Sequence, residues 1–176
     1  MINPYIGSGY QNSKAHRTCV GRVKSHLKTM CTSVDHEIGL VPYRRTDAYG
    51  YNSKNKVLYL CEIKVERTDL PKVFEELPDQ ERRVKKTPEY IKAGVLKVVP
   101  VLAVSNKLYQ ELSKRYPDEW ESMRGTCRKL GISIGVVEQS NIIYLQGKNP
   151  ITLKGKPATK AKTAANAKPA ARVSRK

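Results

Sequence analysis

The sequence predicts an α/β fold, a mixed central β-sheet flanked by helices, followed by a disordered basic C-terminal tail. Two apolar runs, at 57–65 and 95–105, are typical of strands buried inside a sheet. Charged segments with helical periodicity separate such runs. The composition changes abruptly after Gly147, beyond which the chain contains no acidic or aromatic residue.

Composition limits the class of protein. The 176 residues, 39% hydrophobic, suffice for one domain with a core. Thirty-three Lys and Arg against 16 Asp and Glu give a net charge of +17, which favours a polyanionic partner. Because no long apolar run is present, we expect DNA rather than a membrane, and a cytoplasmic location with nucleoid or phage DNA. The four widely spaced cysteines predict reduced thiols and no zinc site.

The first predicted element is an amphipathic helix that begins after Asn12 or Ser13, either of which suits the N-cap. Basic residues occupy the rest of its circumference, so one side is expected to pack on the sheet. We interpret His16, His26 and His36 as surface histidines. Apolar residues recur at every third or fourth position: Ala15, Cys19, Val23, Leu27, Met30 and Val34.

A β-hairpin is predicted next. Short strands at 37–43 and 44–51 lead into a polar loop at 53–56 and then into the central strand. With a four-residue loop, Asp47 falls opposite Glu62. Opposed residues of antiparallel strands share a face, so this register places both carboxylates on one face of the sheet.

Segment 68–92 is the most charged part of the chain. It contains Pro71, Pro78 and Pro88, and proline removes a helical hydrogen bond. We therefore predict two short helices that cross the face of the sheet, the second ending near Gly94.

The remaining elements complete the domain. The run 95–105 predicts another buried strand, and 107–129 predicts a helix broken at Pro117. Segments 131–138 and 142–146 then predict a closing pair of strands.

We place the domain at 1–147 and the tail at 148–176. The tail carries nine basic and no acidic residues, so it holds +9 of the +17 and leaves +8 for the domain. Such a composition does not offset the entropy of folding, and it predicts a disordered DNA-binding arm or a solubilising segment. Its candidate nucleic-acid contacts are Lys154, Lys156, Lys160, Lys162, Lys168, Arg172, Arg175 and Lys176.

The central strand carries the main chemical signal. Alternation places Cys61 on a wholly apolar face, while the opposite face begins with leucines and ends with Glu62 and Lys64. Burying a carboxylate and an ammonium group costs several kcal/mol unless partners compensate. We interpret the pair as catalytic; a structural salt bridge is the alternative.

These residues suit a divalent cation beside a phosphodiester. Asp47, Glu62 and the carbonyl of Ile63 would form a partial oxygen cage for Mg²⁺, which Mn²⁺ can replace. Glu37 is a candidate fourth ligand, and we count it with Asp47, Glu62 and Lys64 among the candidate catalytic residues. Lys64 would orient water or neutralise developing charge.

Two segments resemble a known signature. Arg44-Arg-Thr-Asp47, followed fifteen residues later by Glu62-Ile-Lys64, resembles the D…(E)xK signature of the PD-(D/E)XK nuclease superfamily. Further runs are similar to its MmcB-like DNA-repair branch. The similarity covers about residues 15–146 and implies a restriction-endonuclease-like core with about four strands, and Mg²⁺-dependent DNA cleavage. The further runs are 62–70, 87–90 and 130–137.

Two hypotheses follow. The first is a Mg²⁺-dependent DNA endonuclease acting in repair or on branched DNA. The second is a non-catalytic DNA-binding, DNA-packaging or virion-associated protein on the same fold. Arg44 and Arg45, beside the candidate site, are expected phosphate contacts or exposed charges. Thr46 replaces the usual proline of the signature, and the charged insert 74–86 leaves the preferred DNA structure open. The sequence also leaves open whether the chain forms a homodimer.

Overall fold

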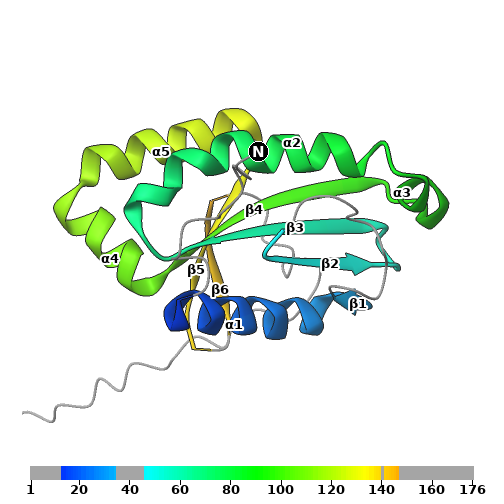
Figure 1. The fold of residues 1–176 in the computed structure, drawn as a ribbon, viewed down its shortest axis with the longest axis horizontal. Coiled ribbons are helices and arrows are strands. Elements are labelled where there is room, and N and C mark those ends of the chain that lie inside the picture. Colours follow the sequence, from blue (N-terminus) through cyan, green and yellow to red (C-terminus); the bar gives the residue numbers. More distant parts are fainter. Residues whose placement is uncertain (1–12, 35–45, 140, 147–176) are drawn as a thin grey trace, which may run out of the picture.

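The computed structural model describes residues 13–34, 46–139 and 141–146, and it contains one mixed six-stranded sheet flanked by helices (Figure 1). The strands lie side by side in chain order. The predicted α/β class is therefore confirmed. The strands are β1 (Ser33–Val34), β2 (Ala48–Asn52), β3 (Val57–Lys64), β4 (Lys97–Ser105), β5 (Ser133–Val137) and β6 (Ile142–Gln146).

The sheet combines hairpin and crossover connections. β1, β2 and β3 are antiparallel neighbours, β3, β4 and β5 are parallel, and β6 returns antiparallel to β5. Parallel neighbours need long connections, which the helices supply. The first crossover contains α2 (Leu70–Val84) and α3 (Pro88–Ala93), and the second contains α4 (Asn106–Arg115) and α5 (Pro117–Leu130).

The two faces of the sheet are covered unequally. One face, called here the α2 face, packs against α2, α4 and α5. The opposite face, called the α1 face, packs against α1 (Lys14–Met30). Figure 1 shows α1 on one side of the strands and α2 and α5 on the other.

The central strand is built as predicted. Leu58 and Leu60 belong to the core of the α2 face, and Tyr59, Cys61 and Ile63 belong to the core of the α1 face. Cys61 is fully buried on that second face. Its predicted place on the apolar face, opposite Glu62 and Lys64, is confirmed.

The hairpin register is also confirmed. Asn52 pairs with Val57 and Ala48 pairs with Cys61, which leaves a four-residue loop. The side chain of Asn52 stabilises this loop by accepting a hydrogen bond from the backbone N–H of Asn55 at 3.0 Å. Asp47 directly precedes β2 and continues the register toward Glu62.

The first helix differs from the prediction at its end. Ser13 is the N-cap, as predicted, but α1 ends at Met30, and Ser33–Val34 form β1. Thr32 explains the change, because its hydroxyl donates to the carbonyl of Tyr51 and its backbone N–H donates to the same oxygen, both at 2.9 Å. These bonds join the chain to the edge of β2.

The proline-rich segment forms the two predicted helices, but Pro78 lies inside α2 and does not end it. Val73 and Leu77 before Pro78 and Val84 after it are all buried on the sheet. This shared apolar side holds the helix together despite the missing hydrogen bond. The predicted break at Pro117 is confirmed, since α4 ends at Arg115 and α5 begins at Pro117.

Several predicted features lie outside the described residues. They are the strand at 37–43, Glu37, Arg44, Arg45 and the tail 148–176 with all its candidate DNA contacts. Among the described residues, no helix is both long and apolar enough to cross a membrane.

Candidate active site at the end of the central strand

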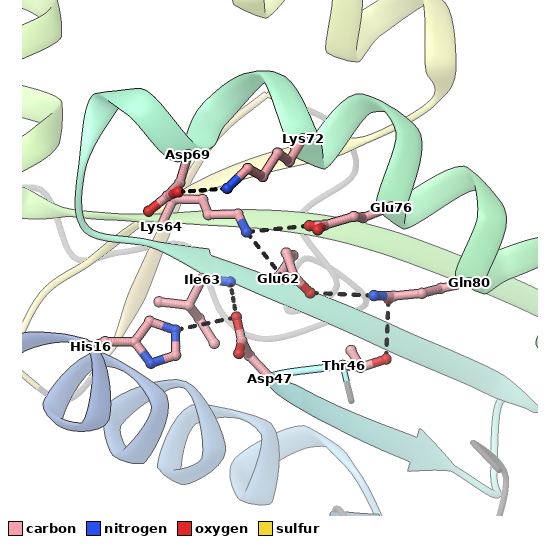
Figure 2. Close-up of polar contacts among 10 residues, drawn as sticks. All are labelled: His16, Thr46, Asp47, Glu62, Ile63, Lys64, Asp69, Lys72, Glu76 and Gln80. Atoms are coloured by element: carbon pink, nitrogen blue, oxygen red, sulfur yellow. Dashed lines mark hydrogen bonds and ion pairs between the residues drawn. The ribbon is translucent and has the colours of Figure 1, made fainter. Parts of the chain in front are cut away.

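The candidate site lies where β3 ends and β2 begins. Glu62 and Lys64 are only 3% and 4% exposed although both side chains are ionisable. Asp47 reaches the same place from the position before β2. Figure 2 shows these side chains between α1 and α2, with partners from both helices. The predicted catalytic residues that the structure describes are therefore brought together.

Lys64 is held by two carboxylates. Its Nζ lies 3.2 Å from Oε1 of Glu62 and 3.3 Å from Oε2 of Glu76, which projects from α2. Burial lowers the pKa of Lys64, but Glu62 and Glu76 together outweigh burial, so the net pKa is raised. Lys64 is therefore a fixed positive charge at neutral pH.

Glu62 lies in surroundings that disfavour its charged form. Burial raises its pKa to about 7; Asp47 contributes in the same direction and Lys64 opposes it. Its second oxygen, Oε2, accepts a hydrogen bond of 3.4 Å from Nε2 of Gln80 in α2. Glu62 thus changes charge close to physiological pH.

Asp47 takes its partners from β3 and α1. Its Oδ2 accepts a hydrogen bond of 2.8 Å from the backbone N–H of Ile63 and lies 3.3 Å from Nε2 of His16. The interaction with Asp47 raises the pKa of His16 despite the burial of the ring, and the backbone of Ile63 acts in the same direction. His16 is thereby favoured in its charged form.

The two carboxylates therefore use different sides of the sheet. Glu62 meets Lys64 and Gln80 on the α2 face, whereas Asp47 meets His16 from α1 (Figure 2). The predicted register holds, yet their partners do not share one face. The peptide of Ile63 lies between them, and its N–H binds Asp47.

Thr46 connects the start of β2 with α2. Its hydroxyl donates a hydrogen bond of 3.1 Å to Oε1 of Gln80, whose amide nitrogen donates to Glu62. Gln80 is therefore held by Thr46, the neighbour of Asp47 in sequence, and in turn orients Glu62. A proline at position 46 would lack this hydroxyl.

The interpretation of His16 and His26 as surface histidines is wrong. They are 6% and 1% exposed, on the side of α1 that faces the sheet. His36 lies outside the described residues. The signal was present in the sequence, because His16 precedes Cys19 by three positions and Val23 by seven, in phase with the buried side of the helix.

Gln80 and Glu76 are the other site residues that sequence reasoning missed. Gln80 follows Leu77 by three positions and precedes Val84 by four, so it occupies the apolar side of α2. A polar residue in such a position is a detectable signal. Glu76 gives none, since one more carboxylate on a charged helix is unremarkable in sequence.

The donor set suits a hard cation. Asp47 and Glu62 offer carboxylate oxygens, the Ile63 carbonyl is a further candidate, and Mg²⁺ prefers a few such ligands with water completing its shell. Burial, and to a smaller extent Asp47, raises the pKa of Glu62, and a bound cation would favour its charged form. Among residues 13–34, 46–139 and 141–146, no three His, Cys, Asp or Glu side chains form a metal-binding group.

Comparison of the chain with protein-family models, with curated proteins and with solved structures finds no match. The resemblance to the PD-(D/E)XK superfamily therefore stays a prediction from the sequence signature. What the fold adds is spatial: Asp47, Glu62 and Lys64 converge at one strand end, between two helices.

Proposed function

We propose that the protein is a Mg²⁺-dependent endonuclease of the PD-(D/E)XK type that hydrolyses phosphodiester bonds in DNA. The observation that carries this proposal is the buried Glu62–Lys64 pair at the end of β3, with Asp47 at the adjacent strand. Burying such a pair in a core costs free energy. A catalytic role in phosphodiester hydrolysis would account for its position at a strand end between two helices.

Each residue has a distinct role. Asp47, Glu62 and the carbonyl of Ile63 would hold the cation, which polarises a phosphoryl oxygen and lowers the pKa of a water when bound. Lys64 acts through its charge, because its raised pKa makes it a poor proton acceptor. It stabilises the negative charge that develops on the phosphate. Gln80 positions Glu62.

DNA is the proposed substrate because the chain is strongly basic, with a net charge of +17. Arg44 and Arg45, which precede Asp47 by three and two positions, are proposed phosphate contacts, and so is the basic tail. Repair intermediates and branched DNA are the substrate classes that the resemblance implies.

One observation favours a second candidate, a non-catalytic DNA-binding protein. Lys64 already lies between Glu62 and Glu76, and Asp47 already binds Ile63 and contacts His16. A network whose charges are matched within the protein also serves as a structural link between α1, β3 and α2. In that case the protein binds DNA and leaves it intact.

Incubation of the full chain with supercoiled, linear and branched DNA distinguishes the two candidates. We expect cleavage with Mg²⁺ or Mn²⁺ and none with EDTA. Asp47→Asn should abolish cleavage, since an amide is a weaker ligand for a hard cation. Asp69→Asn is the matched control, because Asp69, directly before α2, pairs with the exposed Lys72 and with none of the proposed cation ligands.

Two results contradict the nuclease. One is equal cleavage by the wild type and by Asp47→Asn purified in the same way, which would indicate a contaminant. The other is tight DNA binding without cleavage of any of the three substrates, which would establish the second candidate.

A further inference from the structure

α1 differs from the other long helices in its charge. It contains five basic residues and no acidic residue, whereas α2 and α5 each carry both signs. A helix of one sign is suited to a polyanion and poorly suited to pairing within the protein. The five are Lys14, Arg17, Arg22, Lys24 and Lys28.

These charges lie away from the sheet. The side of α1 that packs on the sheet contains His16, Cys19, Val23 and Leu27. Lys14, Arg17 and Lys28 are exposed, and Arg22 and Lys24 are partly exposed. The solvent side of α1 is therefore a continuous basic surface, called here the α1 ridge and defined by the five basic residues.

The α1 ridge leads directly to the candidate site. At one end of the helix, His16 contacts Asp47. At the other end, the side chain of Asn52 donates a hydrogen bond of 2.6 Å to the carbonyl of Met30, beside the β2–β3 loop. That loop carries two more exposed cations, Lys54 and Lys56.

On the opposite side of the sheet, several cations of α2 are paired with carboxylates of the same helix. Asp79 pairs with Arg83 and Glu81 pairs with Lys85 along α2, at 2.7 and 2.6 Å. In contrast, within the part of the chain that the structure describes, no carboxylate forms an ion pair with Lys14, Arg22 or Lys28. α1 therefore presents exposed cations without an acidic residue on the same helix, whereas α2 places carboxylates beside its cations.

We propose that the α1 ridge binds the phosphate backbone of duplex DNA, which runs from the β2–β3 loop along α1 to the candidate site. This inference rests on the proposed function, since it gives the DNA a path to that site. The 17 residues of α1 extend about 25 Å, which corresponds to roughly 7 base pairs. DNA on one side of the cleaved bond should therefore be contacted over about that length, without regard to sequence.

The test compares two pairs of charge-removing substitutions in the full chain. Arg22→Gln/Lys28→Gln alters the α1 ridge, and Lys107→Gln/Lys114→Gln removes two exposed charges of α4 on the α2 face. Glutamine is a good helix former, so both variants should fold. Both keep the tail, whose contribution to binding is therefore the same.

Affinity is measured by fluorescence anisotropy in EDTA, with a duplex of about 30 base pairs, roughly three helical turns. Each α1-ridge cation that binds a phosphate should, when replaced by glutamine, weaken binding about fivefold at about 0.15 M salt. The same replacement should flatten the slope of log K against log salt by about 0.9. The α4 variant should bind like the wild type. Cleavage of the same duplex with Mg²⁺ is assayed in parallel.

The outcomes separate this inference from the proposed function. Equal binding by the two variants, at any level, overturns the α1 path. If cleavage by the wild type persists in that case, the nuclease proposal stands alone. A selective loss of affinity in the α1 variant supports the path even when no DNA is cleaved. Absence of both DNA binding and cleavage by the wild type overturns both.

Discussion

The two ends of α1 each bury a histidine, and the two rings have opposite chemistry. His16 contacts Asp47, and its pKa is raised. Ten residues later, burial lowers the pKa of His26, whose Nε2 has no hydrogen-bond partner among the described residues. The fold buries both rings, but only the first has a carboxylate beside it. Neighbouring charge, rather than depth, distinguishes a site from a packed core.

The surroundings of His26 strengthen the contrast. Its Nδ1 accepts a hydrogen bond of 3.4 Å from the backbone N–H of Ile142, and its ring lies 5.9 Å from that of Tyr144. The Tyr144 hydroxyl also has no partner among the described residues. The Nε2 atom of His16 also lacks a hydrogen bond of good geometry, but it lies 3.3 Å from Oδ2 of Asp47, whereas no carboxylate of the described residues pairs with His26.

The largest expected effect comes from removing one charge of that network. Lys64→Met leaves Glu62 and Glu76 without their shared cation, and such a break costs about 3 to 5 kcal/mol. Urea unfolding at neutral pH measures the decrease in stability. Adding Glu62→Gln to Lys64→Met should restore much of the stability, and cleavage should stay absent.

A decrease below about 1 kcal/mol in Lys64→Met would show that Glu62 and Glu76 do not depend on Lys64 for their compensation. The compensated network would then not distinguish the two ends of α1.

The next effect is the pH dependence that His16 contributes. Because its folded pKa is raised above 6.5, its stabilisation is complete below pH 6.5 and is lost as the pH rises through the folded value. His16→Gln should remove this decline, which amounts to at most about 1.4 kcal/mol per pH unit. Unfolding free energies measured in EDTA across this pH range provide the test. Parallel curves for the two proteins would contradict the His16–Asp47 interaction.

His26 should show a smaller effect of opposite sign. Its folded pKa is lowered, so its contribution is present above pH 6.5 and is lost as the pH falls through the folded value. His26→Leu should remove that acid sensitivity. At neutral pH it deletes an unsatisfied nitrogen but also the acceptor of the long 3.4 Å hydrogen bond from Ile142, and because these two effects oppose each other the net change in stability should stay within about 1 kcal/mol. A destabilisation above about 2 kcal/mol would indicate an additional partner of His26.

Much of the fold could be predicted from the sequence, because the apolar pattern and the loop length determine nearby strands and their register. The run 57–65 specified β3 with both of its faces, and the four-residue loop specified the register of β2. The break at Pro117 was readable for the same reason. The errors at Val34 and Pro78 have one cause, since pairing with β2 and burial of α2 override local preference.

The site was predictable only in part. Asp47, Glu62 and Lys64 were found because a charged pair at the end of an apolar strand is anomalous in itself. The roles of His16 and Gln80 depend on which helix packs on which face near that strand end, and neither residue is anomalous alone. Both nevertheless recur at helical spacing with the buried apolar residues of their helices. A search for polar residues at such positions would therefore have indicated both.

The central claim, that the carboxylates at this strand end form a cation site, is tested most directly by carbon-13 NMR of the Glu62 carboxyl group. Glu62→Gln assigns the resonance. Without divalent cations, burial and Asp47 should place the pKa of Glu62 at about 7. Mg²⁺ should lower this pKa in the wild type and have no effect on it in Asp47→Asn. A pKa that Mg²⁺ and Mn²⁺ leave unchanged in the wild type would contradict the claim and establish the Glu62–Lys64 pair as a structural salt bridge.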